Sequence, residues 1–312
     1  MYDLLNTLFI LCMSCISITH FYVNDSYVKN ALLGYFFIDG YLHRNNTDIF
    51  IHHCLFAFLT YYIQPREFFY KYLLFEWTTL FLMCYRDWKW KTKELFAISW
   101  IALRIVYNPI ITYNIMIDQY HSKYIYFLCS NVMYALFFHW TCKMLHRKIN
   151  TAYGFSSMML YFFPTLFMLY NDTMTFEKYI GVYYQSLISF YFHVIREKKH
   201  DHYLNYKMAK ALDTSGITYF ASRYIIPNQY YQILLSISNV FIKYFFVNSE
   251  FHSIILFLTI CKMLYLHNET IILVIPGSYI MYNNIVHNQF SLFEKYAWHF
   301  CVSISLAYTL MN

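Results

Sequence analysis

A serine, two histidines and an aspartate lie inside strongly apolar segments of the second half of the chain. Ser189 and His193 come at the end of one apolar run, Asp213 comes early in the next, and His299 lies near the start of the last run. Ionisable groups are expensive in hydrocarbon and are usually functional there. This pattern predicts an intramembrane site in the second half.

Histidines contributed by separate helices suit zinc, which takes neutral imidazole nitrogens and, in catalytic sites, keeps one position for water. Bound zinc lowers the pKa of that water to about 7, and the resulting hydroxide attacks an amide or ester carbonyl. His193 ends a predicted span that runs inward, whereas Asp213 and His299 begin spans that run outward, so all three are expected at the cytosolic end. We therefore expect His193 and His299 to bind zinc.

The composition indicates the class of protein that holds this site. Of 312 residues, 59% are hydrophobic and 13% are charged, against roughly 25% charged residues in soluble domains. Short polar breaks separate apolar runs of about 15 to 22 residues, close to the length that crosses a bilayer. The sequence predicts an all-α, polytopic transmembrane helical bundle. We expect about 13 spans, at residues 4–22, 28–42, 49–64, 69–85, 95–115, 124–145, 156–170, 178–195, 207–225, 230–246, 252–266, 269–283 and 291–310.

A polar connection over residues 142–156 divides these spans into two predicted bundles. We expect a boundary near residue 150, with six spans in a domain over 1–150 and seven in a domain over 151–312. If the N-terminus is cytosolic, 14 Lys and Arg residues fall on the cytosolic side and 6 on the opposite side, as the positive-inside rule favours. The net charge of +6 is attributed to this loop bias, so no nucleic-acid partner is expected.

The first half carries short motifs whose order and spacing resemble the TLC family of membrane proteins, which includes ceramide synthases. The motifs are residues 34–39, Asp48 followed by His52 and His53, residues 74–79, 103–105 and 131–145. The resemblance implies that His52 or His53 is a general base for acyl transfer from a thioester to an amine, a role that suits the near-neutral pKa of histidine. The two lie about 100° apart on a helix, so at most one faces a given site squarely. Alternatively, both are interfacial or packing residues.

Two more ionisable residues of the first half, Glu76 and Arg104, lie well inside consecutive predicted spans. Each alone would cost several kcal/mol in hydrocarbon, and pairing would offset much of that cost. We expect both side chains to point into the bundle, and a structural ion pair is their simplest role.

The second half is similar to the seven-span superfamily that joins haemolysin III-like proteins, progestin/adipoQ receptors and alkaline ceramidases. The matching residues are Ser189 and His193 late in the second span of this half, Asp213 within Leu-Asp-x-x-Gly-Ile, and His299 in the seventh. The resemblance implies zinc, with Asp213 acting on the water and Ser189 holding the site or polarising the carbonyl. The family's seventh span usually reads His-x-x-x-His, and Lys295 stands at the first position here, so one ligand is missing.

These features favour an integral membrane protein of lipid metabolism, with sphingolipids as the class that both resemblances suggest, in the endoplasmic reticulum or a related internal membrane. One hypothesis is a zinc-dependent lipid amide or ester hydrolase joined to an acyltransferase-like or lipid-binding half. The competing hypothesis is a non-enzymatic lipid-binding, trafficking or receptor-like protein, in which Ser189, His193 and Asp213 form a polar cluster that holds helices together. A transporter is a third option, weakened because no inverted repeat is visible.

Overall fold

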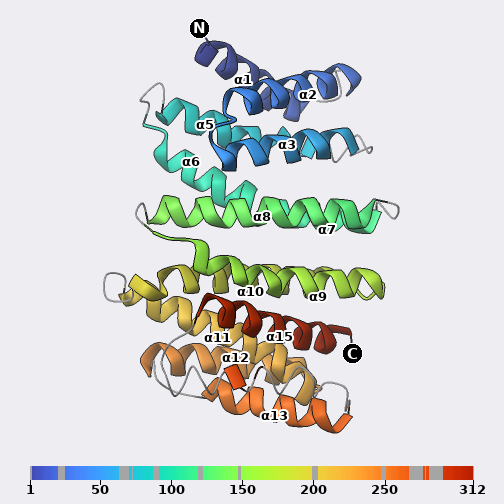
Figure 1. Cartoon of the computed structure of the whole chain (residues 1–312), viewed down its shortest axis with the longest axis vertical. Helices are drawn as coiled ribbons and strands as arrows, with labels where there is room; N and C mark the ends of the chain where they lie inside the picture. The colour runs from blue at the N-terminus through green and yellow to red at the C-terminus, as the bar shows by residue number, and fades with distance from the viewer. Residues whose placement is uncertain are drawn as a thin grey trace. The chain divides into compact units, whose positions relative to one another are not determined.

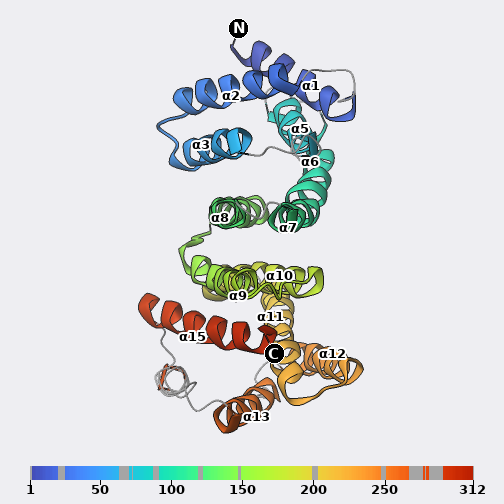
Figure 2. The same cartoon turned by 90° about the vertical axis from the view of Figure 1, so that its right-hand side faces the viewer.

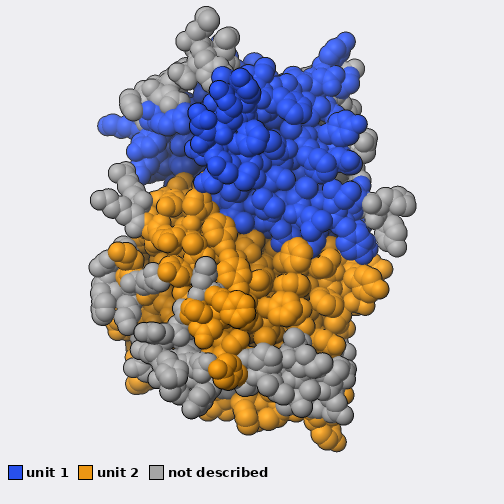
Figure 3. All heavy atoms as spheres, in the orientation of Figure 1, with its two compact units in different colours: residues 1–137 blue, residues 138–312 orange. Residues whose placement is uncertain are grey.

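The computed structural model describes most of the chain, and all its regular structure there is helical (Figures 1 and 2). The described residues are 2–19, 25–62, 70–71, 73–86, 91–118, 122–146, 149–198, 203–246, 251–266, 277, 279–280 and 291–311. The chain divides into two compact units, residues 1–137 and 138–312, which Figure 3 distinguishes by colour. The predicted boundary near residue 150 lies in the connection that follows, whereas this division falls inside a helix.

Unit 1 consists of short helices and contains the first part of α8. Its elements are α1 (Tyr2–Thr19), α2 (Asp25–Leu42), α3 (Thr47–Tyr62), α5 (Glu76–Arg86), α6 (Lys93–Ser99), the π-helix η2 (Trp100–Tyr107), α7 (Asn108–Asp118) and α8 (Lys123–Leu145). Within this unit α2 packs on α3, and α5 packs on both α1 and α6.

Proline explains the irregular segment in unit 1. Pro109 has no N–H, and in a regular helix its ring would clash with the carbonyl four residues earlier. The wider turns of η2 come directly before it, and the Asn108 N–H bonds to the carbonyl of Leu103, five residues back. The segment thus remains helical through the proline.

Unit 2 holds the residues singled out in the second half. Its elements are the 3₁₀ helix η3 (Ala152–Met158), α9 (Met159–Tyr170), α10 (Phe176–Ile195), the short 3₁₀ helix η4 (Arg196–Lys198), α11 (Tyr203–Ile225), α12 (Gln229–Phe245), α13 (Phe251–Leu266) and α15 (Leu292–Met311). Helix α15 packs on α9, and α11 packs on α10, α12 and α13. The predicted span at 269–283 lies largely outside the described residues.

Side-chain caps set where the site-bearing helices begin. Thr175 accepts a hydrogen bond from the Lys178 N–H at the start of α10, and Asn228 accepts one from the Tyr230 N–H at the start of α12. Before α15, the Ser291 hydroxyl accepts from the backbone of Glu294, whose carboxylate accepts from the Ser291 N–H. This reciprocal capping box fixes the first turn of α15.

Within the described part of the chain, three helical segments are long and apolar enough to cross a membrane: Lys93–Asp118, Lys123–Leu145 and Ala152–Tyr170. They support the expectation of an integral membrane protein. The predicted 13 spans and two bundles are not confirmed. Several helices are short for a hydrocarbon core of about 30 Å, which needs about 20 residues; α5 has 11 residues and α13 has 16. Helix α11 has 23 residues but carries Lys207, Lys210, Asp213 and Arg223.

Candidate functional site

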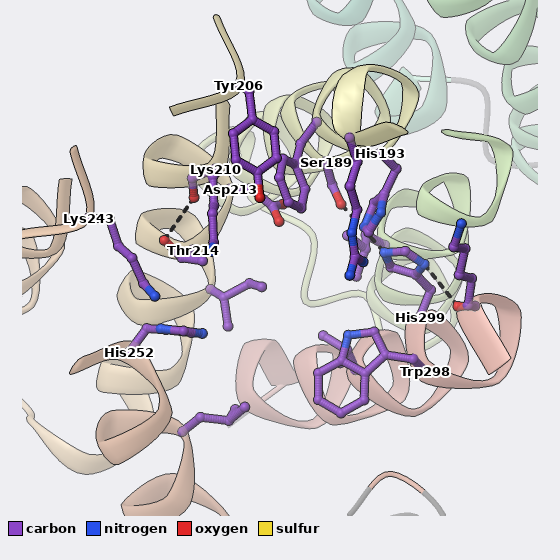
Figure 4. Close-up of a pocket in the computed structure, with 17 residues that line it drawn as sticks. Ser189, His193, Tyr206, Lys210, Asp213, Thr214, Lys243, His252, Trp298 and His299 are labelled. Carbon is purple, nitrogen blue, oxygen red and sulfur yellow. Dashed lines mark hydrogen bonds between the residues drawn. The ribbon is translucent and has the colours of Figure 1, made fainter. Parts of the chain in front are cut away.

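A cavity of about 250 Å³ in unit 2 collects the residues predicted for the second half. Ser189 and His193 reach it from α10, Asp213 from α11, and His299 from α15. Figure 4 shows Ser189, His193 and His299 on one side of the cavity and Lys243 and His252 on the opposite side. The sequence thus identified four side chains that line one cavity, although they are up to 110 positions apart.

A chain of hydrogen bonds runs through Ser189 and His299. The Ser157 hydroxyl donates to Ser189 Oγ at 3.1 Å, and Ser189 Oγ lies 3.5 Å from His299 Nε2. His299 Nδ1 lies 3.0 Å from the backbone oxygen of Lys295. A carbonyl oxygen only accepts, so Nδ1 carries the proton and, in a neutral ring, Nε2 is the acceptor. The Ser189 hydroxyl can therefore donate to His299.

His193 is buried beside His299. Its side chain is 9% exposed, and the two imidazole centroids are 4.7 Å apart with nearly perpendicular rings. Among the described residues, His193 Nδ1 is buried and has no hydrogen-bond partner. Leaving such an atom unsatisfied costs about 1–3 kcal/mol. The side chain lines the cavity, but this nitrogen is covered by protein atoms.

Asp213 is held by a glutamine that the sequence analysis did not single out. Gln185 Nε2 donates to Asp213 Oδ1 and to the Asp213 backbone oxygen, both at 3.0 Å. Gly216 makes this approach possible, because a Cβ at that position would lie 1.5 Å from Gln185 Oε1. The glycine of the Leu-Asp-x-x-Gly-Ile motif therefore makes room for the partner of its aspartate.

Cationic side chains also line the cavity. They are Arg196, Lys210, Lys243 and Lys295, and Asp213 is the one carboxylate among the described lining residues. Lys243 is 1% exposed and Lys295 is 7% exposed. The Lys295 ammonium sits 3.8 Å from the centroid of the Tyr153 ring, a close cation–π contact.

The zinc site implied by the resemblance does not fit these side chains. Among the described residues, no group of three or more His, Cys, Asp or Glu side chains is placed to hold a metal ion. His193, Asp213 and His299 line the same cavity without forming such a group. The predicted missing ligand remains missing, because Lys295 adds a positive charge to the cavity instead of an imidazole.

In unit 1, the neighbouring residues His52 and His53 have different surroundings, as expected from their 100° separation on a helix. His53 is 7% exposed, and its Nδ1 lies 3.0 Å from Asp39 Oδ2, while His43 approaches the other Asp39 oxygen at 3.4 Å. His52 is half-buried, and its ring packs on Phe56 at a centroid distance of 4.6 Å. Of the two candidate bases, His53 is therefore the one beside a carboxylate.

Glu76 and Arg104 are buried as expected, at 7% and 3% exposure. No salt-bridge contact within 4.0 Å joins these two residues, although they are near enough for their charges to interact. Arg104 Nε donates to Thr78 Oγ1 at 3.1 Å, and an Nη donates to the Phe75 carbonyl at 3.2 Å. Its guanidinium is also surrounded by aromatic rings with centroids 5.1–5.9 Å away, those of Phe56, Phe75, Trp100 and Phe137. Backbone, hydroxyl and aromatic contacts therefore hold Arg104.

Some of the site residues that the sequence analysis did not single out could have been found from the sequence. Gln185, Ser189 and His193 are spaced by four and so share a helix face. Lys243 lies inside a predicted span, where a charge indicates function by the same rule that identified His193. Ser157 and Arg196 lie at the edges of predicted spans and carried no comparable signal.

Comparison of the chain with protein-family models, curated proteins and solved structures finds no match.

Proposed function

We propose that the protein is an integral membrane protein that binds a membrane lipid, with the polar part of the lipid in the cavity of unit 2. The observation that carries the proposal is the reversed polarity of α12, which lines that cavity. Its exposed side chains include Tyr230, Leu234, Ile237, Phe241 and Phe245, each at least 48% exposed and spaced three or four residues apart.

The opposite face of α12 is polar and buried. Gln232, Asn239 and Lys243 are 5%, 0% and 1% exposed. A helix at the surface of a soluble protein shows the reverse pattern. An apolar outer face with a polar inner one is what a helix between lipid and a polar cavity requires.

The size of the cavity limits what it can hold. Pockets that bury a drug-sized ligand are about 300–1,000 Å³, and this cavity is about 250 Å³. It therefore suits a headgroup and the adjoining linkage, while acyl chains would lie against the apolar outer faces. Leu160, Trp298 and Val302 supply apolar lining for the start of a chain.

Photocrosslinking tests lipid binding without a choice of headgroup. Cells fed a photoreactive fatty acid label glycerolipids and sphingolipids alike, and crosslinked peptides of the purified protein are then mapped. We expect labels on α10 and α15 beside the cavity, and their loss in Val302→Trp, which fills it. Ile254→Trp, on the exposed face of α13, is the matched control. Uniform labelling of all outward-facing helices, unchanged by Val302→Trp, would refute the proposal.

The contact between Ser189 and His299 favours a second candidate, metal-independent hydrolysis of a lipid ester or amide. Ser189 Oγ would attack the carbonyl carbon as its proton passes to His299 Nε2. The proton then goes to the departing alcohol or amine, and water hydrolyses the Ser189 acyl ester. A distance of 3.5 Å is long for this step but typical of a site without substrate.

A serine-reactive fluorophosphonate tests this candidate. We expect labelling of the wild type, its loss in Ser189→Ala and His299→Ala, and no effect of metal chelators. Ser305→Ala, at an α15 serine away from the cavity, is the control. If Ser189→Ala labels as strongly as the wild type, Ser189 is not a nucleophile, and lipid binding without hydrolysis is the better account.

A further inference from the structure

Three helices that line the cavity of unit 2 share a register. Helix α10 runs antiparallel to both α11 and α15, because residues near its end and near its beginning contact each of these helices in the reverse order. The contacts with α11 are Gln185–Asp213 and Glu177–Arg223, and those with α15 are Ser189–His299 and Lys178–Leu310. The lining side chains of the three helices can therefore be ordered along one axis of the cavity.

Helices α12 and α13 fit the same axis. Helix α12 runs antiparallel to α11, and α13 runs parallel to it. The contacts of α12 with α11 are Asn239–Thr214 and Gln232–Ile226, and those of α13 are Thr259–Ala221 and Lys262–Tyr224. About one turn away from these contacts, Lys243 of α12 is level with Lys210 of α11. In the same way, Leu256 of α13 is level with Ile217 of α11.

Along this axis the described lining changes from cationic to apolar. One end, which we call the outer end, is lined by the cations Arg196, Lys210, Lys243 and Lys295. The opposite end, the inner end, is lined by apolar side chains from three helices, those of Ile217, Leu256 and Val302. On α15, Lys295 precedes His299 and Val302 follows it. The contact between Ser189 and His299 therefore lies between the two ends.

A cavity with this order of polarity orients an amphiphile. A polar headgroup finds hydrogen-bonding partners at the outer end, whereas at the inner end it would lose its hydrogen bonds to water without replacement, which is costly. A hydrocarbon chain has the opposite preference. The order depends on polarity alone, so it holds whether or not the cations are paired within the protein. At the boundary, the Ser189 hydroxyl is a donor for the carbonyl of an ester or amide.

We propose that an acyl lipid enters this cavity chain first, with the first carbons of one acyl chain at the inner end, its ester or amide linkage beside Ser189 and its headgroup at the outer end. The inference rests on the lipid binding proposed above and names the class of lipid and its direction. Ile217, Leu256 and Val302 then determine which chains fit. All three are half-buried, as side chains that line a binding cavity are.

The chain-length dependence of binding tests this orientation. The full chain in nanodiscs is crosslinked by a photoreactive monoacylglycerol, and 1-monoacylglycerols with acetyl, butyryl, hexanoyl or octanoyl chains compete with it. Their common headgroup is uncharged, so only the chain differs. The concentration that halves crosslinking is compared between a variant and the wild type, because this ratio cancels partition of the competitor into the bilayer.

Leu256→Trp fills the inner end. We expect it to weaken competition by the hexanoyl and octanoyl esters about ten- to hundred-fold, the range that overfilling a packed space typically costs, and to leave the acetyl ester nearly unchanged. Leu256→Ala enlarges the inner end and should shift the preference toward longer chains, which keeps the test decisive if Leu256→Trp fails to fold. Ile254→Trp, on the exposed face of the same helix, is the matched control and should change no ratio.

The outcomes separate this proposal from the one it rests on. Crosslinking that all four esters inhibit, with ratios independent of chain length in both Leu256 variants, would overturn the chain-first orientation and leave lipid binding intact. Equal effects of Leu256→Trp and Ile254→Trp would show a general effect on α13 and would also overturn it. Absence of any competable crosslink in the wild type would overturn lipid binding itself, and the orientation with it.

Discussion

Replacing Gly216 with alanine tests how the cavity holds its aspartate. A Cβ at position 216 would lie 1.5 Å from Gln185 Oε1 and 2.7 Å from its Cδ, so the Gln185 side chain must move. Gln185 is 4% exposed and has little room. Moving it breaks both hydrogen bonds to Asp213, and Asp213, 5% exposed, loses its amide donor.

The expected change in the free energy of unfolding follows from these two hydrogen bonds. A hydrogen bond to a charged group contributes about 1.5–3 kcal/mol and a neutral one about 0.5–1.5 kcal/mol. Alanine is favoured over glycine in a helix by about 1 kcal/mol, which offsets part of the loss. We expect Gly216→Ala to lower the free energy of unfolding by about 1–3 kcal/mol and to weaken binding of the cavity ligand.

Thermal unfolding in detergent measures the change, with Gly34→Ala as the control. Gly34 also lies within a helix, but a Cβ there would meet nothing within 4 Å, so alanine should raise the midpoint slightly. The double variant Gly216→Ala/Gln185→Ala should be no less stable than Gln185→Ala alone, because the clash is gone. If the two single losses add in the double variant, the steric explanation is wrong.

Three further predictions concern other contacts. His53→Ala should destabilise the protein more than His52→Ala in thermal unfolding, since only His53 lies beside Asp39; full retention of any acyl-transfer activity in both variants would remove these histidines from a mechanism. Arg104→Lys should lower stability by about 1–3 kcal/mol, because an ammonium cannot reproduce the fork that reaches Thr78 and Phe75, whereas an unchanged midpoint would contradict those contacts. Lys295→His should raise the zinc content of the purified protein by elemental analysis, since it supplies an imidazole and removes a charge, and equal zinc content in the wild type and the variant would argue against metal binding at this position.

Some of this arrangement could be predicted from sequence, because an ionisable residue inside an apolar segment is energetically costly and usually functional, whichever helix carries it. That rule drew attention to Ser189, His193, Asp213 and His299, and all four line one cavity. The number of spans could not be predicted in the same way. The apolar run at 69–85 predicted a span, yet the helix α5 found there has 11 residues, too few to cross a hydrocarbon core of about 30 Å.

Which side chains contact each other was harder to predict than which side chains are buried. Glu76 appeared to be the natural partner of Arg104, yet the guanidinium contacts a hydroxyl, a backbone carbonyl and aromatic rings. Which acceptors lie within reach depends on helix packing and on the π-helix around Arg104. Asp39 and His53 likewise meet because α2 packs on α3. One sequence contains no direct record of such inter-helix registers.

The cationic side chains that line the cavity bear on whether it suits a metal ion. Two unit charges about 4 Å apart interact by about 4 kcal/mol at an effective dielectric constant of 20, and a zinc ion carries two charges. Each lysine near the ion would therefore oppose zinc binding. Lys295 brings an ammonium to a cavity that three other cations also line, so its side chain disfavours a metal ion at this place.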